Sequence, residues 1–380
     1  MIGTALRMNP RNDTIEYTRT PSNGGSKVTE DNSTQKESII FRLHPQRESS
    51  RLIFQLGTAS PELAVQAAEL VAPYVAGIDV NAGCPKPFST SGGMGAALLS
   101  TPDLLCDILK ALVKEIGQKH LIGISVKIRL LKTPEMTRAL VERLCDTGIT
   151  GLTIHCRTKE MRKTEKAVRI QLRMVGEVCR SYGVACLMNG DVESREQAET
   201  LVTDFGVDGA MIATAAEKNP SVFRAKVDGG VAPWHETVRL YMEEAIHVEN
   251  RWGNTKFLLA QMMPGKEQSR IGLSQGKNYE HLCELLDMAD LAERARTLDA
   301  LLGITQRETK SEMKARIKNE KKAKVESETP SRRNFNNAKR PRSDNVGNDP
   351  KRPRRSSNGQ EHDLCDTFPS VELIGSAIAA

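Results

Sequence analysis

Cys84 is the residue of this chain whose surroundings point most directly to chemistry. It lies in the segment Asn81-Ala-Gly-Cys-Pro-Lys-Pro-Phe88, between an aliphatic run at 77–80 and the segment Ser91-Gly-Gly-Met-Gly95. Glycine permits backbone angles that other residues avoid and proline restricts φ, so this composition predicts a tight loop at the carboxyl end of a strand. Enzymes built on parallel sheets bind their ligands at such strand ends. We therefore predict a catalytic thiol at Cys84; the alternative is a buried apolar cysteine.

Polar residues also stand at the ends of the other predicted strands. They are Gln55, Lys127, Arg129, His155, Arg157, Asn189, Asp191 and Thr214. Taken singly, Lys127 could form a structural ion pair, His155 could be a structural histidine, and Asn189-Gly190 is a common turn. Because parallel strands end at one edge or rim, we expect these groups to meet there and to bind one ligand.

The pattern favours a phosphorylated flavin as that ligand. A phosphate held by backbone N–H groups at helix starts suits the late strand ends, which carry Asn189, Gly190, Asp191, Ala213 and Thr214. The hydrogen-bonding ring of the ligand could be held by Gln55, Lys127 and His155. No Gly-x-Gly-x-x-Gly motif follows a strand, which disfavours a bound nicotinamide dinucleotide.

The elements that must position these residues alternate in type. Aliphatic runs at 52–56, 77–80, 124–128, 151–155, 185–188 and 209–212 are separated by amphipathic segments such as 60–75, 101–116, 133–147 and 194–205. This alternation predicts an α/β domain over residues 51–228, with six βα units and a parallel sheet. Residues 1–50 predict a polar insertion or hairpin with strands at 14–18 and 38–43. A small helical domain is predicted at 229–304 and a basic, disordered tail at 305–380.

Composition excludes several classes of protein. The 380 residues are 39% hydrophobic and 27% charged, as in soluble globular proteins, and no apolar run approaches the ~18 residues of a membrane span. The eight cysteines form no Cys-x-x-Cys pair, which disfavours a zinc cluster or a disulfide framework and fits a reducing compartment. The net charge of +6 comes from residues 305–380, with 17 Lys+Arg against 11 Asp+Glu; the remainder has 37 of each.

Six motifs, in order, resemble the signature of tRNA-dihydrouridine synthases over residues 50–300. They are Asn81-x-Gly-Cys-Pro85, Gly93-Met-Gly-x-x-Leu-Leu99, Ser125-Val-Lys-Ile-Arg129, His155-x-Arg-Thr158, Asn189-Gly-Asp191 and Gly209-Ala-Met-Ile-Ala213. The form Cys-Pro-Lys-Pro-Phe-Ser and the basic C-terminal extension are most similar to the eukaryotic class that reduces the uridine at position 20 of the tRNA D-loop.

This resemblance implies an FMN enzyme that takes hydride from NADPH and delivers it to C6 of uracil, while Cys84 protonates C5. Thiols ordinarily titrate near pH 8.5, so a cysteine can serve as a general acid at neutral pH. The resemblance also implies that Gln55 and Lys127 contact the flavin ring and that His155 lies near the ring and phosphate. The implied phosphate contacts are Asn189, Gly190, Asp191, Ala213 and Thr214, although the family often has Gly-Arg in place of Ala213-Thr214. Phosphates of a tRNA whose uridine is extracted from its stack would be anchored by Lys86, Arg129, Arg157 and Arg162.

The fold implied by the resemblance is the (β/α)8 TIM-type barrel of FMN-dependent oxidoreductases, followed by a small helical domain. The sequence predicts only six of the eight βα units, and the Ala-Pro-Met strand that opens the family's barrel is missing. We therefore expect a barrel lacking its first two βα units, in a chain N-terminally truncated relative to the family, and we expect activity to suffer because a parallel barrel needs every strand to close.

The tail and the partners complete the prediction. Two basic clusters, Lys339-Arg-Pro-Arg342 and Lys351-Arg-Pro-Arg-Arg355, form the pattern of a bipartite nuclear localisation signal. We expect a monomer in nucleus and cytoplasm, with tRNA and NADPH as partners and without a membrane. Two alternatives stay open: a catalytically silent RNA-binding remnant, which would lack a yellow chromophore, and another FMN-barrel oxidoreductase acting on a small molecule.

Overall fold

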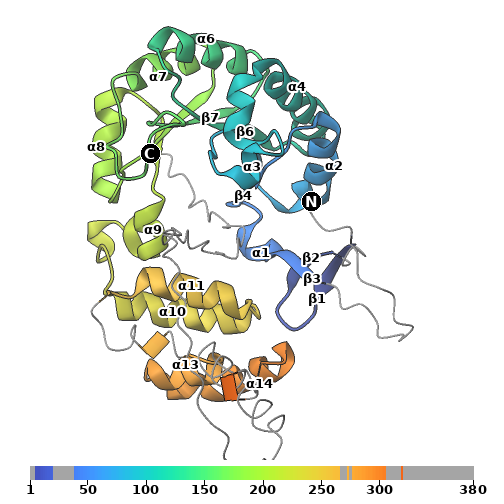
Figure 1. Cartoon of the computed structure of the whole chain (residues 1–380), viewed down its shortest axis with the longest axis vertical. Helices are drawn as coiled ribbons and strands as arrows, with labels where there is room; N and C mark the ends of the chain where they lie inside the picture. The colour runs from blue at the N-terminus through green and yellow to red at the C-terminus, as the bar shows by residue number, and fades with distance from the viewer. Residues whose placement is uncertain (1–4, 20–37, 266–271, 274–275, 305–317, 320–380) are drawn as a thin grey trace, which may run out of the picture. The chain divides into compact units, whose positions relative to one another are not determined.

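The computed structural model describes residues 5–19, 38–265, 272–273, 276–304 and 318–319 (Figure 1). The chain divides into two units, residues 1–305 with 373–380 and residues 306–372; of the second, only residues 318 and 319 are described. Every described strand belongs to the first unit.

Six parallel strands form the larger of two sheets. They lie side by side in their order along the chain, β4-β5-β6-β7-β8-β9. Their bounds are β4 Ile53–Leu56, β5 Gly77–Asn81, β6 Gly123–Arg129, β7 Gly151–His155, β8 Ala185–Asn189 and β9 Gly209–Met211. Each parallel neighbour is reached through a crossover that contains helix, as parallel pairing requires. The predicted α/β fold with a parallel sheet is confirmed.

The two faces of this sheet differ in polarity because successive side chains of a strand point to opposite sides. One face is apolar and buried; it includes Ile78, Val80, Ile124, Val126, Ile128, Leu152 and Ile154. The other face carries polar rows that run across neighbouring strands. The register pairs Gln55 with Asp79 and Asp79 with Ser125, Asn81 with Lys127, and Arg129 with His155, which pairs in turn with Asn189. The apolar face thus belongs to the core, and the polar face is available for a site.

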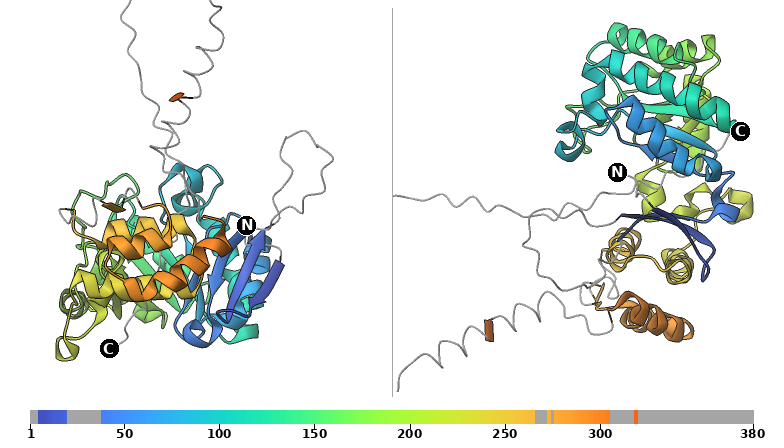
Figure 2. Two further views of the ribbon diagram at one scale, coloured as in Figure 1. Left: turned by 90° about the horizontal axis from the view of Figure 1, so that it is seen from below. Right: turned by 90° about the vertical axis from the view of Figure 1, so that its right-hand side faces the viewer.

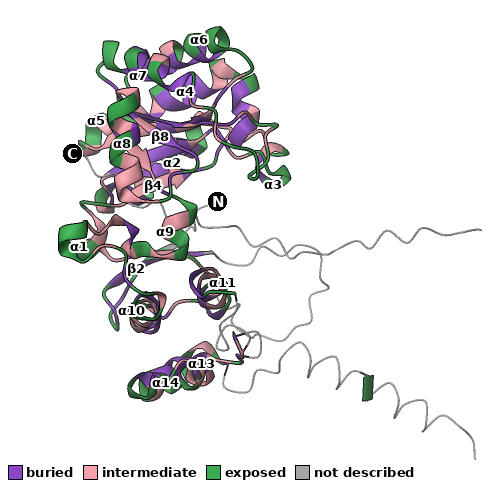
Figure 3. Cartoon of the chain, turned by 90° about the vertical axis from the view of Figure 1, so that its left-hand side faces the viewer, coloured by how far each residue is buried: buried purple, intermediate pink, exposed green. Residues whose placement is uncertain are grey.

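Five longer helices cover the apolar face (Figures 1 and 2). They are α2 Pro61–Val71, α4 Pro102–Leu112, α6 Pro134–Cys145, α7 Leu172–Ser181 and α8 Arg195–Phe205. Their buried residues join those of the strands in one hydrophobic core. Figure 3 shows the resulting division: the strands are mostly buried, and the outer surfaces of the helices are exposed.

The helix starts are set by local sequence. Ser60, Thr133 and Ser194 each accept a hydrogen bond from the N–H three residues on, at 3.2, 3.3 and 3.1 Å, which satisfies a donor that the helix itself cannot pair. Proline, whose missing N–H costs nothing at a first helical position, opens α2, α4 and α6. Short helical turns complete this region: η1 Ala72–Tyr74, α3 Pro87–Thr90, η2 Gly95–Ser100, η3 Val113–Gly117, α5 Gln118–His120, α9 Thr214–Lys218, η4 Pro220–Phe223 and η5 Lys226–Asp228.

A separate antiparallel sheet precedes the parallel one. Its strands β1 Ala5–Asn9, β2 Thr14–Arg19 and β3 Ser38–Leu43 are ordered β1-β2-β3, and the short helix α1 Pro45–Glu48 follows. The predicted strands at 14–18 and 38–43 are confirmed, and β1 is an additional strand. The sheet packs on the main core through Tyr17, whose hydroxyl donates to the Leu70 carbonyl at 3.0 Å.

In the described residues after the sheet the regular elements are helices, as predicted for residues 229–304. They are α10 Trp234–His247, α11 Trp252–Met262, α13 Tyr279–Leu285, η6 Ala289–Leu291 and α14 Ala292–Leu302. Their buried residues form a second core, distinct from the first, in which the rings of Trp252 and Tyr279 meet edge to face at 5.4 Å. Among the described helices, none has the length and apolar character needed to cross a bilayer.

A buried ionic network links the antiparallel sheet to these helices. Glu16 accepts from Arg42 at 2.7 Å and from Asn9 at 2.9 Å, and Arg42 also donates to the carbonyl of Glu249 at 2.7 Å. The Glu249 side chain accepts from Asn9 at 3.1 Å and from Arg11 at 2.8 Å. We call these five residues the Glu16–Glu249 network. It joins the two cores through Glu16, Arg42 and Glu249, which are largely withdrawn from water, whereas the Arg11 side chain is 56% exposed.

Candidate active site on the polar face of the parallel sheet

Cys84 lies in a loop whose backbone is fixed by hydrogen bonds. The Cys84 loop (residues 82–86) follows β5, and the side-chain oxygen of Asn81 accepts from the N–H of Gly83 at 3.1 Å and of Cys84 at 3.0 Å. The Cys84 carbonyl accepts from the N–H of Ala96 at 2.9 Å, which ties the loop to η2. Cys84 is half-buried, whereas the other six cysteines in the described part of the chain are buried free thiols. Cys84 is therefore the thiol that a ligand on the polar face can reach.

Gly95 has no room for a side chain beside this loop. Its φ is +59°, in the left-handed region, and a Cβ there would lie 2.6 Å from the Cys84 carbonyl oxygen and still closer to Ser89 Oγ. Glycine is required at position 95 because η2 approaches the Cys84 loop closely there.

A row of hydrogen-bonded side chains lies behind the loop. Asn81 Nδ2 donates to Gln55 Oε1 at 2.8 Å, and Gln55 Nε2 donates to Asp79 Oδ2 at 2.8 Å. The other carboxylate oxygen of Asp79 accepts from the Ser125 hydroxyl at 2.7 Å. Gln55 is the predicted ring contact, whereas Asp79 and Ser125 were not predicted as site residues. In the structure all three belong to one chain of bonds that ends at the Cys84 loop.

Three cationic side chains surround His155. Burial, followed by the charges of Lys127, Arg129 and Arg157, lowers the pKa of His155 to about 3, so the imidazole is neutral at physiological pH. Arg157 Nη1 lies 3.2 Å from His155 Nε2. A guanidinium can only donate, so Nε2 is the acceptor and Nδ1 carries the proton. The result is a concentration of positive charge at the ends of β6 and β7, which suits an anionic or electron-rich ligand.

Arg157 is buried, with 5% of its surface exposed. It forms an ion pair with Asp191 and donates to the carbonyl of Glu165 at 2.7 Å. Burial raises the pKa of Asp191, but hydrogen bonds from Arg157 and the Ala167 N–H, together with the charges of Arg157 and Arg169, outweigh it and lower the pKa overall. This guanidinium holds the loops after β7 and β8 together, and its burial and partners argue against the RNA contact expected of it.

The segment after β8 is positioned by its neighbours. Asn189 Nδ2 donates to the Met211 carbonyl at 3.0 Å, and Arg169 Nη2 donates to the carbonyls of Gly190 and Asp191 at 2.9 and 3.1 Å. Gly190 has φ of +119°, and a Cβ there would lie 3.2 Å from Ala167. Arg169, which sequence analysis did not identify, therefore fixes the backbone expected to bind phosphate. The Asp191 carboxylate itself would repel a phosphate, so its N–H is the group that could contribute.

The remaining expected residues lie nearer the surface. Ala213 and Thr214, at the start of α9, are exposed, as are Lys86 and Arg162. Arg129 is half-buried and donates to the carbonyls of Gly83 at 2.6 Å and Thr158 at 2.9 Å. It thus braces the Cys84 loop against the loop after β7, which its predicted role as a phosphate anchor did not include.

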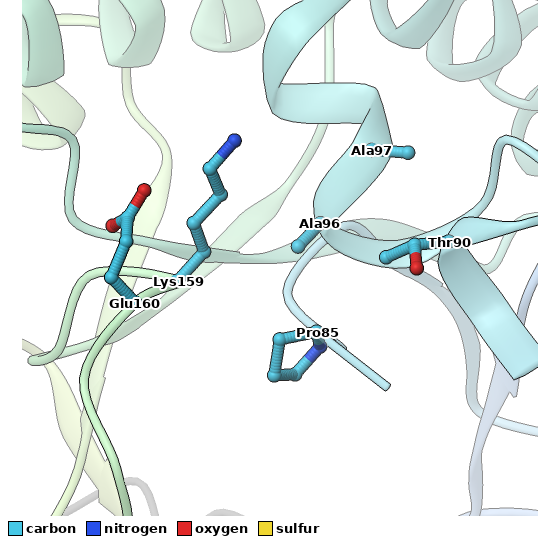
Figure 4. A pocket seen from close by; sticks show the side chains of 6 residues that line it. All are labelled: Pro85, Thr90, Ala96, Ala97, Lys159 and Glu160. Carbon is cyan, nitrogen blue, oxygen red and sulfur yellow. The ribbon is translucent and has the colours of Figure 1, made fainter. Parts of the chain in front are cut away.

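A cavity of about 420 Å³ opens beside the Cys84 loop, at Pro85. Its lining residues are Pro85, Thr90, Ala96, Ala97, Lys159 and Glu160 (Figure 4). In the close-up, Pro85, Thr90 and the two alanines come from the side of the Cys84 loop, and Lys159 and Glu160 come from the loop after β7. Small apolar side chains with one cation and one carboxylate at the rim could admit a flat polar ring.

Comparison with known proteins identifies similar chains. A model of the dihydrouridine synthase family matches residues 28–299. The tRNA-dihydrouridine(20) synthase [NAD(P)+] of Schizosaccharomyces pombe is 47% identical over 277 residues, which cover 72% of this chain and 54% of that protein. The protein of the same name from Saccharomyces cerevisiae is 46% identical over 238 residues, covering 61% and 62%. This chain therefore spans between about half and three fifths of the length of these relatives.

Among solved structures, morphinone reductase in complex with tetrahydroNAD aligns with a TM-score of 0.32 and 12% identity, over 57% of each chain.

Proposed function

The chain belongs to the dihydrouridine synthase family, and we propose that it reduces the uridine at position 20 of the tRNA D-loop to 5,6-dihydrouridine. The observation that carries the proposal is the polar face itself. It presents one accessible thiol, Cys84, beside a cationic group built from Lys127, Arg129 and Arg157. A small-molecule oxidoreductase on the same barrel, or a silent RNA-binding remnant, becomes the better account if the tests below fail.

We propose FMN as the resident cofactor and NADPH as the reductant. The residues present fit an anionic flavin: Arg169 presents the backbone of Gly190 and Asp191, and cations surround the neutral His155. In this proposal Lys127, His155 and Gln55 lie toward the ring, and the phosphate side comprises Asn189, Gly190, Asp191, Ala213 and Thr214. The chemistry expected of bound FMN is hydride transfer, from NADPH and onto C6 of uracil, which side chains cannot supply.

Cys84 would donate its Sγ proton to C5 of the uracil. The loop bonds from Asn81 keep the thiol at the end of β5, and η2 closes one side of it. A positioned general acid contributes roughly 10²- to 10⁴-fold to such a step. No base lies in the local motif to make Cys84 a nucleophile, so we favour the acid role.

Binding of the tRNA would fall to exposed cations around the cavity. Lys86 and Arg162 are exposed, and Lys159 lines the rim. We propose that these side chains contact phosphates while the extracted base enters beside Pro85. We also propose that residues 229–304 act as a tRNA-recognition domain and that the protein acts as a monomer.

We further propose that β4–β9 are six strands of a (β/α)8 barrel of the FMN oxidoreductase type. In support, all six are parallel and sequential, with helices on one face and the polar rows on the other. Eight-strand closure would require two further strands between β9 and β4, which the described residues do not contribute.

The proposed nuclear and cytoplasmic location rests on the basic clusters at 339–342 and 351–355. Both lie outside the described residues, as does the predicted disordered tail apart from residues 318 and 319.

The test is a pair of measurements on the purified 380-residue chain. A flavin absorption band should appear, and tRNA lacking dihydrouridine should gain it at position 20 when NADPH is added. Cys84→Ala should retain the band and tRNA affinity but lose at least about 100-fold in rate. A colourless chain that still binds tRNA would replace the proposal with the RNA-binding remnant. A yellow chain that oxidises NADPH without modifying tRNA would favour a small-molecule enzyme.

A further inference from the structure

We propose that Asp79 is a positioning residue that fixes the conformation of the Cys84 loop through Gln55 and Asn81. The inference rests on the proposed function only in taking Cys84 as the proton donor. The chain of bonds is a property of the protein alone, and it can be tested without cofactor or tRNA.

The contacts form a continuous path across two strands. Asp79 and Asn81 lie two residues apart on β5, so they share the polar face, and Gln55 on β4 is the register partner of Asp79. Gln55 reaches both of them, donating to Asp79 Oδ2 and accepting from Asn81 Nδ2, each at 2.8 Å. Asn81 Oδ1 then accepts from the N–H groups of Gly83 and Cys84.

The Asp79 carboxylate determines how the side-chain amides of Gln55 and Asn81 are oriented. Both carboxylate oxygens of Asp79 accept hydrogen bonds, so Gln55 turns its NH₂ toward Asp79 and its oxygen toward Asn81. Asn81 must then turn its NH₂ toward Gln55, which leaves its oxygen facing the loop. With Gln55 reversed, its oxygen would face the Asp79 carboxylate and its NH₂ would face that of Asn81. With Asn81 reversed, its oxygen would face Gln55 Oε1, and the loop N–H groups would lose their acceptor. One buried acceptor thus sets both amides.

The position of Asp79 calls for such a role. Its strand neighbours Ile78 and Val80 are fully buried, and Asp79 itself is 4% exposed. Burying a carboxylate is costly unless hydrogen bonds compensate it. Ser125, which donates to the other carboxylate oxygen, supplies one such bond without touching Gln55. This separation provides a control within the same side chain.

The experiment measures hydrogen exchange at the two loop amides in the full chain. Asp79→Leu removes the acceptor at similar size, and we expect exchange of the Gly83 and Cys84 N–H groups to rise about tenfold, as for the loss of a buried hydrogen bond. Amides of β8, which lies elsewhere in the sheet, should change less than twofold. Asp79→Asn should largely restore protection, because its oxygen can face Gln55 while its NH₂ donates to Ser125.

A second probe is the rate at which iodoacetamide alkylates Cys84, followed by mass spectrometry of its peptide. The other described cysteines are buried, so the signal comes from a defined site. We expect the Asp79→Leu rate to differ at least threefold from that of the parent chain, and the Ser125→Ala rate to remain within twofold.

Two results would overturn the inference. One is a folded Asp79→Leu protein with unchanged exchange at Gly83 and Cys84; the other is a rise spread evenly over the sheet, which would indicate a merely structural carboxylate. If Asp79→Leu does not fold, Gln55→Met breaks the path at its middle and must give the same local increase. Since neither probe uses FMN, NADPH or tRNA, failure of the proposed function would leave these outcomes unaffected.

Discussion

At the scale of single residues, the surroundings of a side chain fix its protonation state or limit its size. His155 is the clearest case, because burial and three neighbouring cations lower its pKa to about 3. A neutral imidazole among cations accepts a hydrogen bond from Arg157 and adds no further charge to the site. Gly95 is the steric counterpart, a position at which any side chain would collide with the Cys84 loop.

We predict that His155 does not titrate between pH 5 and 8. Its imidazole signals, assigned by their loss in His155→Gln, should stay constant in an NMR titration over that range. The unfolded chain gains this proton near pH 6.5 and the folded chain only near 3, so stability should fall with acidification below pH 6.5, by at most ~1.4 kcal/mol per pH unit. His155→Gln should remove that part of the slope. A midpoint above pH 5 would contradict the prediction.

Gly95→Ala should destabilise the protein and disrupt the loop. Left-handed backbone alone costs an alanine ~1–2 kcal/mol, and here the Cβ also meets Ser89 and Cys84. Gly183→Ala is the matched control, since its φ of +70° is similar but no atom lies within 4 Å of the added Cβ. Urea unfolding should show a larger loss for Gly95→Ala, by ~1–3 kcal/mol. Equal losses would mean that the loop yields to the side chain.

At the scale of elements, the sequence predicted the strands well and their partners poorly. The runs of aliphatic residues locate β4 to β9 because a strand buried on one face needs them there. Asp79 is different: its partners Gln55 and Ser125 lie 24 and 46 residues away. Only the strand register brings them together, and register cannot be deduced from the type of one residue.

One strand, β1, was missed for a local reason, and one helix, α7, was implied by the six βα units without being located. Helix α7 has Gly176 in its middle, where glycine weakens the helical signal; the structure uses it for close packing, with the Gly206 carbonyl 3.1 Å from the place a Cβ would take. Strand β1 is short, and it is stabilised by pairing with β2 rather than by its own composition. The role of Arg169, in the long loop after β7, could not be predicted either, because Arg169 donates hydrogen bonds to the backbone of another loop.

The loop after β7 should depend on Arg157. This guanidinium binds the carbonyl of Glu165 and the carboxylate of Asp191, so Arg157→Met should free residues 158–168. We expect trypsin to cut after Arg162 or Lys163 about tenfold faster under native conditions. Arg173→Met, which removes a surface guanidinium bound to the Asp204 carbonyl, is the control and should leave cleavage unchanged. Equal rates for both variants would show that the loop is held by other contacts.

At the scale of the whole molecule, two hydrophobic cores are joined by the Glu16–Glu249 network. The hydrogen bond from Arg11 lowers the pKa of Glu249. Burial raises that of Glu16, but bonds from Arg42, Arg7 and Asn9 outweigh it and lower the pKa overall. Both carboxylates therefore contribute stability above the ordinary glutamate value of 4.5 and lose it as the pH falls below.

Arg42→Met should weaken this link and reduce its pH dependence. The variant leaves Glu16 buried without its main partner, and we expect a loss of about 3 kcal/mol in unfolding free energy at pH 7. The loss should shrink as the pH falls from 5 to 3, because the parent chain also loses the ion pairs there. Arg47→Met, which removes an exposed pair with Glu244, should cost under ~1 kcal/mol. An equal loss at pH 7 and pH 3 would show that packing, not charge, joins the cores.

The two faces of the parallel sheet have opposite polarity, and successive residues of a strand point to opposite faces. The sequence of each strand therefore has a period of two residues. Shifting β5 by one residue would turn Ile78 and Val80 toward the ligand and press Asp79 and Asn81 against the helices, so the core and the site would fail together. A shift by two would keep every side chain on its own face, but it would move Asp79 out of register with Gln55 and displace the Cys84 loop. Deleting one residue within these strands should therefore prevent folding, whereas deleting two adjacent residues should yield folded proteins in which the Cys84 thiol is displaced. We therefore expect length changes in this protein to be tolerated in its loops or, within the strands, in even steps.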